Sequence, residues 1–387
     1  MKNPKIRFKG FADDWEQCKL NNICKYISSP LTVKDVCKNG KYDLYDANEL
    51  IGKTNKSPIN DNYISIIKDG AGVGRVRKLP KNTSILGTMG AIIPTESNYD
   101  YLFYALEKID FSKLTSGGTI PHIYFKQYGE EKYFAPKPDE QEKIGAYFSR
   151  LDNLITLHQR KCEETKTLKK YMLQKMFPQN GMNIPEIRFN GFTGTWEQHR
   201  LGDIVERITM KNQDLVSTLP LTISAQYGLI DQNEFFDKRV ASKDVSGYYL
   251  IKKGEFAYNK STSTDAPWGA VKRLDRYENG VLSTLYIVFK IKDEERINSD
   301  YLVSYYDTDL WYRGIREIAT EGARNHGLLN IATSDFFETK LIIPQDIEEQ
   351  KRIGKYFNNL NQFLTFHQQK CDELQSIKKF MLQNMFV

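Results

Sequence analysis

Mostly apolar residues recur along the C-terminal part of the chain in alternating steps of four and three. The positions are Ile353, Phe357, Leu360, Leu364, His367, Cys371, Leu374, Lys378, Met381 and Met385. Such steps place the side chains on one face of a helix, as in a heptad seam. About 38 residues at the rise of an α-helix give a length of roughly 57 Å, which favours a partner helix.

The same seam occurs once before, at Ile144, Phe148, Leu151, Ile155, His158, Cys162, Thr165, Lys169, Met172 and Met176. Asp139 and Asp346 lie where each helix should begin, and Pro178 should end the first helix. We predict that the two helices pair antiparallel, which would relate the two halves of the chain by a pseudo-two-fold axis. The polar seam residues, which are His158, His367, Lys169 and Lys378, would then fix the register. Two ordinary bundle helices are the alternative interpretation.

These helices belong to a tandem repeat that covers the chain. The segments Ile6 to Phe11 and Trp15 to Gln17 return at 187–192 and 196–198, an offset of 181. The stretch from Glu140 to Phe148 returns at 349–357, an offset of 209. The middle of the second half is therefore 28 residues longer, and it shows no obvious identity with the first. A shared frame around two different middles is expected when two modules do the same mechanical job on two targets.

Both middles are typical of mixed α/β structure with short strands. We predict strands at 63–67 and 84–87, a glycine-rich turn within 69–78, and the strongest strand at 281–289. Residues 101–108 and 301–312 should be helical. The predicted fold class is α+β, with two tandem mixed α/β domains (1–137 and 179–343), each followed by a long helix (138–178 and 344–387), and the helices paired as an antiparallel coiled coil.

Composition narrows the class of protein. Hydrophobic residues make up 40% and charged residues 27%, the balance of a soluble globular protein. No apolar stretch approaches the ~20 residues that cross a bilayer, and no signal-peptide core is visible, so we expect a cytoplasmic protein without a membrane partner. The five cysteines lack the paired spacing of a zinc site and are expected to be reduced. The net charge of +6 permits a polyanionic partner but does not require one.

Basic, aromatic and small polar residues are interleaved late in each middle, at 115–126 and 321–330. Side chains of these kinds reach base edges and phosphates. From composition and position, the candidate DNA contacts are Arg75, Arg77, Lys78, Thr119, His122, Tyr124, Lys126, Lys260, Ser261, Lys272, Arg273, Arg324, Asn325 and His326. Ordinary polar surface loops are the alternative.

Catalytic motifs are missing from the sequence. The glycines at 70, 72 and 74 are not followed by the Gly-Lys-Ser/Thr of a phosphate loop. No Asn-Pro-Pro-aromatic or Asp-Pro-Pro-aromatic tetrapeptide of an amino-methylating enzyme occurs, and the carboxylates near Asp139 are more typical of a helix N-terminus than of a nuclease site. The histidines show neither metal-ligand spacing nor a triad. We therefore predict no catalytic residue, metal or cofactor in the chain.

As a duplicated set, these motifs resemble the specificity subunits of type I restriction-modification systems over the whole chain. The set comprises the Ile-Arg-Phe-x-Gly-Phe and Trp-Glu-Gln openings, the Pro136–Gln141 and Pro344–Gln350 helix entries, the Ile-Gly-x-Tyr-Phe continuations, and the Lys-Lys-aromatic-Met-Leu-Gln-x-Met-Phe exits. The resemblance implies that each middle reads one half of an asymmetric, split double-stranded DNA site and that the helices set the spacer. It also implies binding without catalysis.

The resemblance further implies partners. Two methyltransferase subunits, which bind S-adenosylmethionine, would dock on the repeated segments, and ATP-dependent restriction subunits would join through them. Our candidates for docking are Phe8, Trp15, Phe189 and Trp196, together with the outward faces of the long helices. Core packing is the alternative for the tryptophans. A stand-alone DNA methyltransferase or nuclease, and a transcriptional regulator or coiled-coil scaffold, are the competing functions.

Overall fold

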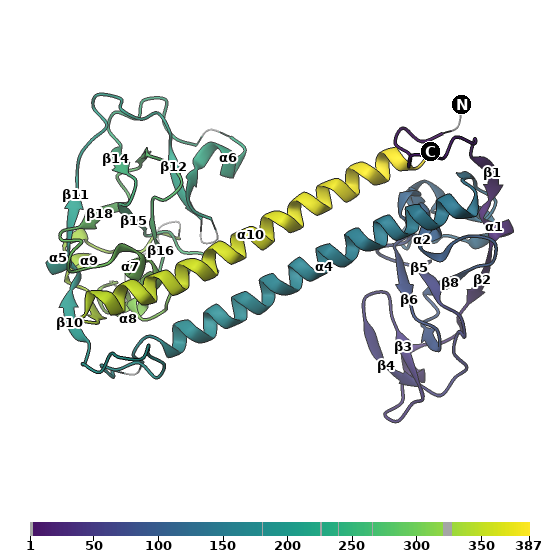
Figure 1. Cartoon of the computed structure of the whole chain (residues 1–387), viewed down its shortest axis with the longest axis horizontal. Helices are drawn as coiled ribbons and strands as arrows, with labels where there is room; N and C mark the ends of the chain where they lie inside the picture. The colour runs from purple at the N-terminus through teal and green to yellow at the C-terminus, as the bar shows by residue number, and fades with distance from the viewer. Residues whose placement is uncertain (1–2, 180, 225–226, 239, 265, 320–326) are drawn as a thin grey trace. The chain divides into compact units, whose positions relative to one another are not determined.

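The structure of the chain is a computed structural model, which describes residues 3–179, 181–224, 227–238, 240–264, 266–319 and 327–387 (Figure 1). The chain forms two compact units. Unit 1 comprises Met1–Arg160 and His367–Val387, and unit 2 comprises Lys161–Phe366. Each unit therefore contains one α/β domain and part of both long helices. The predicted boundaries gave each long helix a segment of its own, whereas the contacts divide each helix between the two units.

The α/β domain of unit 1 is built around a sheet with strand order β2-β8-β5-β6, and its central strand β5 is buried along its whole length. A second sheet has the order β4-β3-β7, and β1 pairs with β9. The elements among the described residues are β1 (Glu16–Lys19), α1 (Leu20–Ile23), β2 (Cys24–Ser28), η1 (Val33–Asp35), β3 (Tyr42–Tyr45), β4 (Leu50–Thr54), β5 (Tyr63–Ile67), β6 (Val76–Leu79), β7 (Thr83–Ile85), β8 (Met89–Pro94), α2 (Tyr99–Lys108), η2 (Phe111–Leu114), α3 (Phe125–Tyr128) and β9 (Lys132–Ala135).

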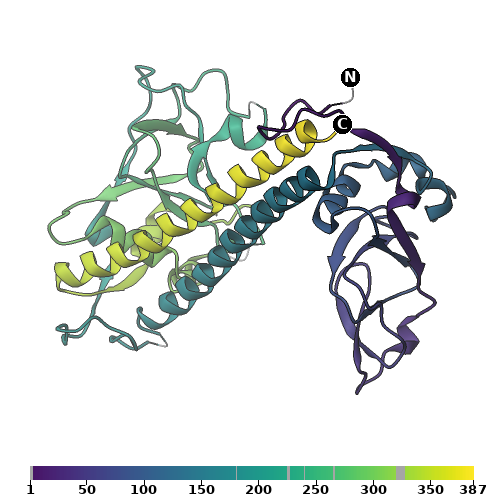
Figure 2. The ribbon, with the colours of Figure 1, turned by 45° about the vertical axis from the view of Figure 1, so that its right-hand side comes forward.

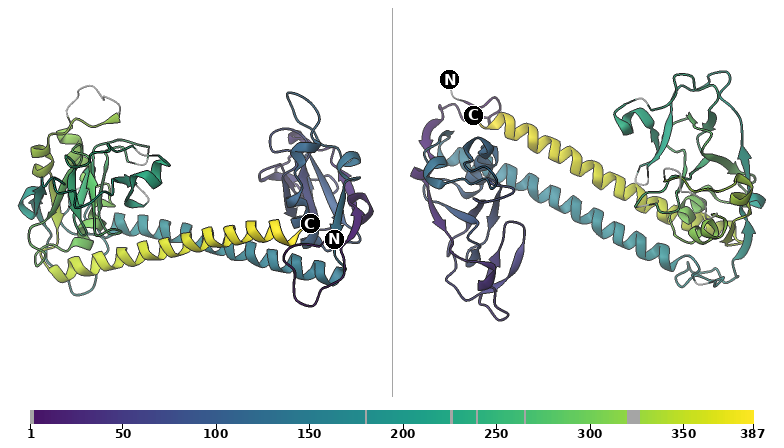
Figure 3. Two further views of the ribbon diagram at one scale, coloured as in Figure 1. Left: turned by 90° about the horizontal axis from the view of Figure 1, so that it is seen from above. Right: turned by 180° about the vertical axis from the view of Figure 1, so that it is seen from behind.

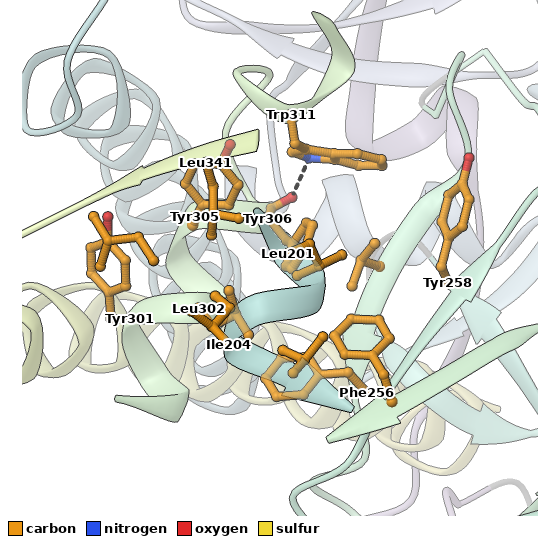
Figure 4. Close-up of a cluster of buried hydrophobic side chains, with 14 of the residues drawn as sticks. Leu201, Ile204, Phe256, Tyr258, Tyr301, Leu302, Tyr305, Tyr306, Trp311 and Leu341 are labelled. Atoms are coloured by element: carbon orange, nitrogen blue, oxygen red, sulfur yellow. Dashed lines mark hydrogen bonds between the residues drawn. The ribbon is translucent and has the colours of Figure 1, made fainter. Parts of the chain in front are cut away.

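Unit 2 repeats this plan with the sheet order β11-β18-β15-β16, and β10 pairs with β19. Its core is rich in aromatic side chains, and Trp311 donates to the backbone oxygen of Tyr306 at 3.1 Å (Figure 4). The elements are β10 (Glu197–Arg200), α5 (Leu201–Ile204), β11 (Val205–Ile208), β12 (Leu221–Ser224), β13 (Gly228–Asp231), α6 (Gln232–Phe236), β14 (Tyr249–Lys252), β15 (Phe256–Asn259), β16 (Ala270–Arg273), β17 (Asn279–Leu282), β18 (Ile287–Ile291), α7 (Ser299–Tyr306), α8 (Trp311–Ile318), α9 (Thr333–Glu338) and β19 (Lys340–Ile343).

The two long helices are α4 (Pro138–Lys175) and α10 (Ile347–Met385), and both are unbroken (Figure 3). In unit 1, His158 contacts His367 at 2.7 Å between the two Nδ1 atoms, and the Cys371 thiol lies 3.8 Å from the Ile155 oxygen. From His367 to Cys371 the chain runs towards the C-terminus of α10, whereas from His158 to Ile155 it runs back towards the N-terminus of α4. In unit 2 the Cys162 thiol lies 3.9 Å from the Leu364 oxygen. These contacts are consistent with the predicted antiparallel pairing, and all predicted seam positions are buried or half-buried.

The repeated sequence motifs build the junction between domain and helix. Arg7 donates two hydrogen bonds to the buried carboxylate of Glu140, at 2.7 and 2.8 Å, and Arg188 does the same to Glu349, at 2.6 and 2.7 Å. The hydrogen bond to the carboxylate raises the pKa of Arg7, as its copy does for Arg188. The opening Ile-Arg-Phe therefore clamps the start of the long helix in each unit, which explains why the two motifs recur together.

Each long helix has a glycine shortly after this glutamate, Gly145 in α4 and Gly354 in α10. At this position the helix lies so close to a neighbouring helix that only glycine fits. A Cβ on Gly145 would lie 2.8 Å from the Cβ of Asp100, and one on Gly354 would lie 2.8 Å from the Cβ of Asp300. Because real Cβ atoms do not come this close, only glycine lets the long helix pack against α2 or α7. The same requirement at both positions accounts for the repeated Ile-Gly.

The ends of the long helices return to the cores. Phe386 packs against Trp15 and Tyr101 in unit 1, with ring centroids 6.4 and 5.5 Å apart, and the N-terminal segment lies beside it, since the Ile6 amide donates to the Asn384 oxygen (Figure 2). In unit 2 its copy Phe177 packs against Trp196 and Tyr301, at 6.0 and 5.7 Å. Each domain is therefore completed by the C-terminal end of a long helix.

Two predicted elements are corrected. The strand expected at 281–289 is two strands, β17 and β18, separated by a turn at Ser283 to Tyr286. They belong to different sheets, because β17 pairs with β14 whereas β18 pairs with β11 and β15. The helix expected at 301–312 is likewise two helices, α7 and α8, with Asp307 at the end of the first. The strand at 63–67 and the helix at 101–108 are confirmed.

Candidate nucleic-acid interface and partner surface

In unit 1 the glycine-rich turn after β5 lies beside the loop that carries several predicted DNA contacts. The Gly70 amide donates to the Pro121 oxygen at 3.0 Å, and the Ile123 amide donates to the Lys68 oxygen at 2.9 Å. The side chain of His122 contacts Asp69, with 2.7 Å between Nδ1 and Oδ1. Thr119, Tyr124 and Lys126 on this loop are exposed, as a surface for a large ligand requires.

The predicted basic residues of β6 and the preceding turn are bound within the domain. Arg75 donates to the Asn48 side chain at 2.7 Å, and Arg77 donates to the Asn48 backbone oxygen at 2.6 Å. Lys78 forms an ion pair with Asp100 at 2.6 Å and lies over the ring of Tyr104. These contacts give the three cations structural roles, and Arg75 alone among them is exposed.

In unit 2 the residues after β15 lie beside the second candidate loop. The Leu329 amide donates to the Lys260 oxygen at 2.9 Å, and the Thr262 amide donates to the Gly327 oxygen at 2.8 Å. Lys260 is half-buried and Ser261 is exposed. Arg324, Asn325 and His326, the other candidates on this loop, lie outside the described residues.

Lys272 and Arg273 on β16 form ion pairs inside unit 2. Lys272 and the seam residue Lys169 both contact Asp307, at 2.9 and 2.7 Å. Burial raises the pKa of Asp307, but the positive charges of Lys272 and Lys169 outweigh this effect and hold it below its ordinary value. Arg273 pairs with Asp300 at 2.8 Å. Sequence reasoning missed these acidic partners because they are distant along the chain.

The docking candidates divide into two kinds. Trp15 and Trp196 are buried in the hydrophobic cores, so the prediction that they contact a partner is corrected and core packing accounts for them. Phe8 and Phe189 are half-buried and pack edge-on against Tyr147 and Tyr356, with ring centroids 6.0 and 6.3 Å apart. They remain candidates.

A second stripe, which we call the flanking stripe, runs along each long helix one residue before the seam positions. Its exposed apolar members are Leu154, Leu157, Leu168 and Tyr171 on α4 and, 209 residues later, Phe363, Phe366, Ile377 and Phe380 on α10. An ion pair occupies the middle of each stripe, Lys161–Glu164 at 3.1 Å and Lys370–Glu373 at 2.6 Å. Exposed apolar side chains repeated at equivalent positions are typical of a protein interface.

The described residues contain no cluster of three or more side chains that could hold a metal ion. Within the same ranges, no helix is long and apolar enough to span a membrane.

The fold can be compared with that of a solved structure. It is similar to the crystal structure of the type I restriction-modification system S subunit from M. genitalium, with a TM-score of 0.69 over 100% of this chain and 99% of that one, at 16% identity. At this identity the likeness concerns the fold alone.

Sequence comparisons find similarity over parts of the chain. Residues 12–167 match the type I restriction modification DNA specificity domain. A stretch of 212 residues is 28% identical to the type I restriction enzyme MjaVIII specificity subunit of Methanocaldococcus jannaschii and spans about half of each chain. Over these parts of its sequence the chain is similar to type I restriction-modification specificity subunits.

Proposed function

We propose that the chain reads an asymmetric, two-part site in double-stranded DNA for a type I restriction-modification complex in the cytoplasm. Unit 1 reads one half of the site and unit 2 reads the other. The observation that carries this proposal is the duplicated frame. Both units share the Arg–Glu hydrogen bonds at the start of the long helix, the close contact at the helix glycine and the phenylalanine that packs into the core at a helix end. The domains inside the frames differ in sequence and length.

In this proposal the length of the helices sets the number of unread base pairs between the half-sites. Helices of 38 and 39 residues extend roughly 57 Å at 1.5 Å per residue, and base pairs are ~3.4 Å apart along the duplex. The DNA contacts come from the two candidate segments, chiefly from the exposed Thr119, Tyr124, Lys126 and Ser261 and the half-buried Lys260, with Arg75 nearby. The bound cations Arg77, Lys78, Lys272 and Arg273 would support these loops.

The proposal is tested by mapping methylated adenines in the DNA of cells that express the chain with the methyltransferase encoded beside it. We expect one motif with two different halves and a fixed gap. A symmetric or ungapped motif would refute the two-reader arrangement. If the purified chain alone methylated DNA with S-adenosylmethionine, the competing function of a stand-alone methyltransferase would be favoured instead. Binding confined to partners other than nucleic acids would favour a coiled-coil scaffold.

We also propose that two methyltransferase subunits, which carry S-adenosylmethionine, dock on the flanking stripes with Phe8 and Phe189, and that the ATP-dependent restriction subunits join through them. The pairing of equivalent apolar residues at the 209-residue offset supports two similar docking surfaces. The double variant Leu168→Glu/Tyr171→Glu should lose one methyltransferase in co-purification. Lys170→Glu, a neighbouring exposed charge change, is the matched control and should retain both.

A further inference from the structure

The two candidate loops have the same backbone scaffold in both units. In unit 1 the Ile123 amide donates to Lys68 and the Gly70 amide donates to Pro121, and in unit 2 the Leu329 amide donates to Lys260 and the Thr262 amide donates to Gly327. Between these bonds lie equivalent isolated β-bridges, Asp69 with His122 and Ser261 with Leu328. The first loops therefore correspond with an offset of 192 and the second loops with an offset of 206.

The strand register supports the same correspondence independently. Lys78 lies opposite Ile64 in β5, and Arg273 lies opposite Phe256 in β15. Lys78 and Arg273 are equivalent because each forms an ion pair with the acidic residue of the following helix, Asp100 or Asp300. Counting along the two central strands from Ile64 and Phe256 then brings Lys68 level with Lys260.

On this scaffold some side chains are shared and others differ. Lysine stands at the base of both scaffolds, as Lys68 and Lys260, and a buried aliphatic residue fills the equivalent interior position, as Ile123 and Leu329. The bridge between the loops carries Asp69 and His122 in unit 1 but Ser261 and Leu328 in unit 2. All four of these bridge residues are exposed or half-buried.

The chemistry of the two bridges is different. A carboxylate can only accept, so the Nδ1–H of His122 donates to Asp69 and leaves Nε2 for another partner. A neutral imidazole would use Nε2 to accept from the amino group of adenine or cytosine, whereas a charged one would donate to guanine. Leu328 offers instead an apolar contact of the kind that recognises the methyl group of thymine.

We infer that the bridge between these two loops is a specificity-determining site in each unit, with Asp69 and His122 reading the first half-site and Ser261 and Leu328 reading the second. Asp69 acts as a positioning residue, since it fixes the tautomer and orientation of His122. Lys68 and Lys260, at the base that both units share, supply contacts that do not depend on the DNA sequence. This inference rests on the proposed function and names the residues that distinguish the two readers.

The test uses the chain in complex with its methyltransferase and a DNA library in which both half-sites are randomised. The double variant Asp69→Ser/His122→Leu carries the bridge of unit 2 in unit 1. We expect the base preference of the first half-site to change at one or two base pairs by roughly tenfold to a hundredfold, from the usual worth of one good base contact. The second half-site should stay unchanged, which also reports that the complex has folded.

Two further variants distinguish a role of the bridge residues in base recognition from a purely structural role. Asp69→Asn keeps the size but removes the carboxylate acceptor, and it should relax the preference at the same base pair. His199→Leu removes a histidine on β10 that also lies near a carboxylate, Glu197 at 3.7 Å, but outside both loops. This matched control should leave both half-sites unchanged.

The outcomes distinguish the inference from the proposed function. A wild-type complex without sequence preference in either half would overturn both. A wild-type preference that the double variant retains in the first half-site would overturn the inference alone. If methylation by the variant is too weak to map, selection of bound DNA from the same library decides, because an unchanged first half-site among the bound molecules is the contradicting result.

Discussion

The phenylalanine at the end of each long helix gives a sharp prediction about how the units are completed. Phe386 is 7% exposed and packs against the rings of Trp15, Tyr101 and Phe148, at centroid distances of 6.4, 5.5 and 5.8 Å. Truncation of a buried phenylalanine to alanine costs about 3–5 kcal/mol, from lost burial and the cavity left behind. Phe386→Ala should therefore destabilise unit 1 although it lies one residue from the C-terminus.

The size of the effect follows from the size of the unit. Each kcal/mol shifts the melting temperature of a body of 150–250 residues by about 2–4 °C, so the expected shift is about 6–20 °C. Calorimetry measures it, and hydrogen exchange assigns it, because amides of α2 should exchange faster while those of α7 should not. Val387→Ala is the control, since Val387 is 51% exposed and its truncation should change the stability by less than about 0.5 kcal/mol.

The equivalent variant in unit 2 completes the test. Phe177→Ala should destabilise unit 2, so that α7 exchanges faster and α2 does not, because Phe177 packs against Trp196, Tyr301 and Phe357. If Phe386→Ala shifted the melting temperature no more than Val387→Ala, the claim that the phenylalanine at each helix end completes a hydrophobic core would be refuted. The same would follow if both phenylalanine variants loosened the same helix.

Further predictions concern the junction and the buried ion pairs. Gly145→Ala should destabilise unit 1 by about 1–3 kcal/mol in chemical denaturation, because its Cβ would meet Asp100, and a neutral effect would contradict the close approach. Asp307→Asn should cost about 3 kcal/mol at neutral pH, because it leaves Lys272 and Lys169 without their carboxylate. Since the folded-state pKa of Asp307 is depressed, this stabilisation is present above its unfolded value and is lost as the pH falls through the folded value. The difference between Asp307→Asn and wild type should therefore shrink in acid, and an equal difference at both pH values would exclude the ion pairs as its cause.

The repeat and the helical seams could be predicted because they depend on local periodicity. The step pattern gave the seam positions of α4 and α10, and the identity of the flanks placed the two frames. The break between β17 and β18 could not be seen, because an apolar run does not reveal that its two parts join different sheets. Periodicity describes one segment, whereas sheet membership depends on segments that are distant in sequence.

The candidate site shows the same limit. His122 and Lys260 were found from composition, but Asp69 and Lys68 were missed, because only the hydrogen bonds between loops some 50 residues apart bring them into the same place. The acidic partners of Lys78 and Arg273 were missed for the same reason. Trp15 was interpreted as a docking residue because a repeated tryptophan is equally typical of a core and of an interface.

The measurement that tests the central claim most directly is a domain exchange. Residues 21–135 are replaced by the equivalent segment of a relative, which keeps Arg7, Trp15 and the long helices, and methylated adenines are mapped before and after the exchange. The account predicts that one half of the motif changes while the other half and the gap remain. A motif that is unaltered by the exchange in a folded complex, or one that changes in both halves, would contradict the claim that each unit reads its own half-site.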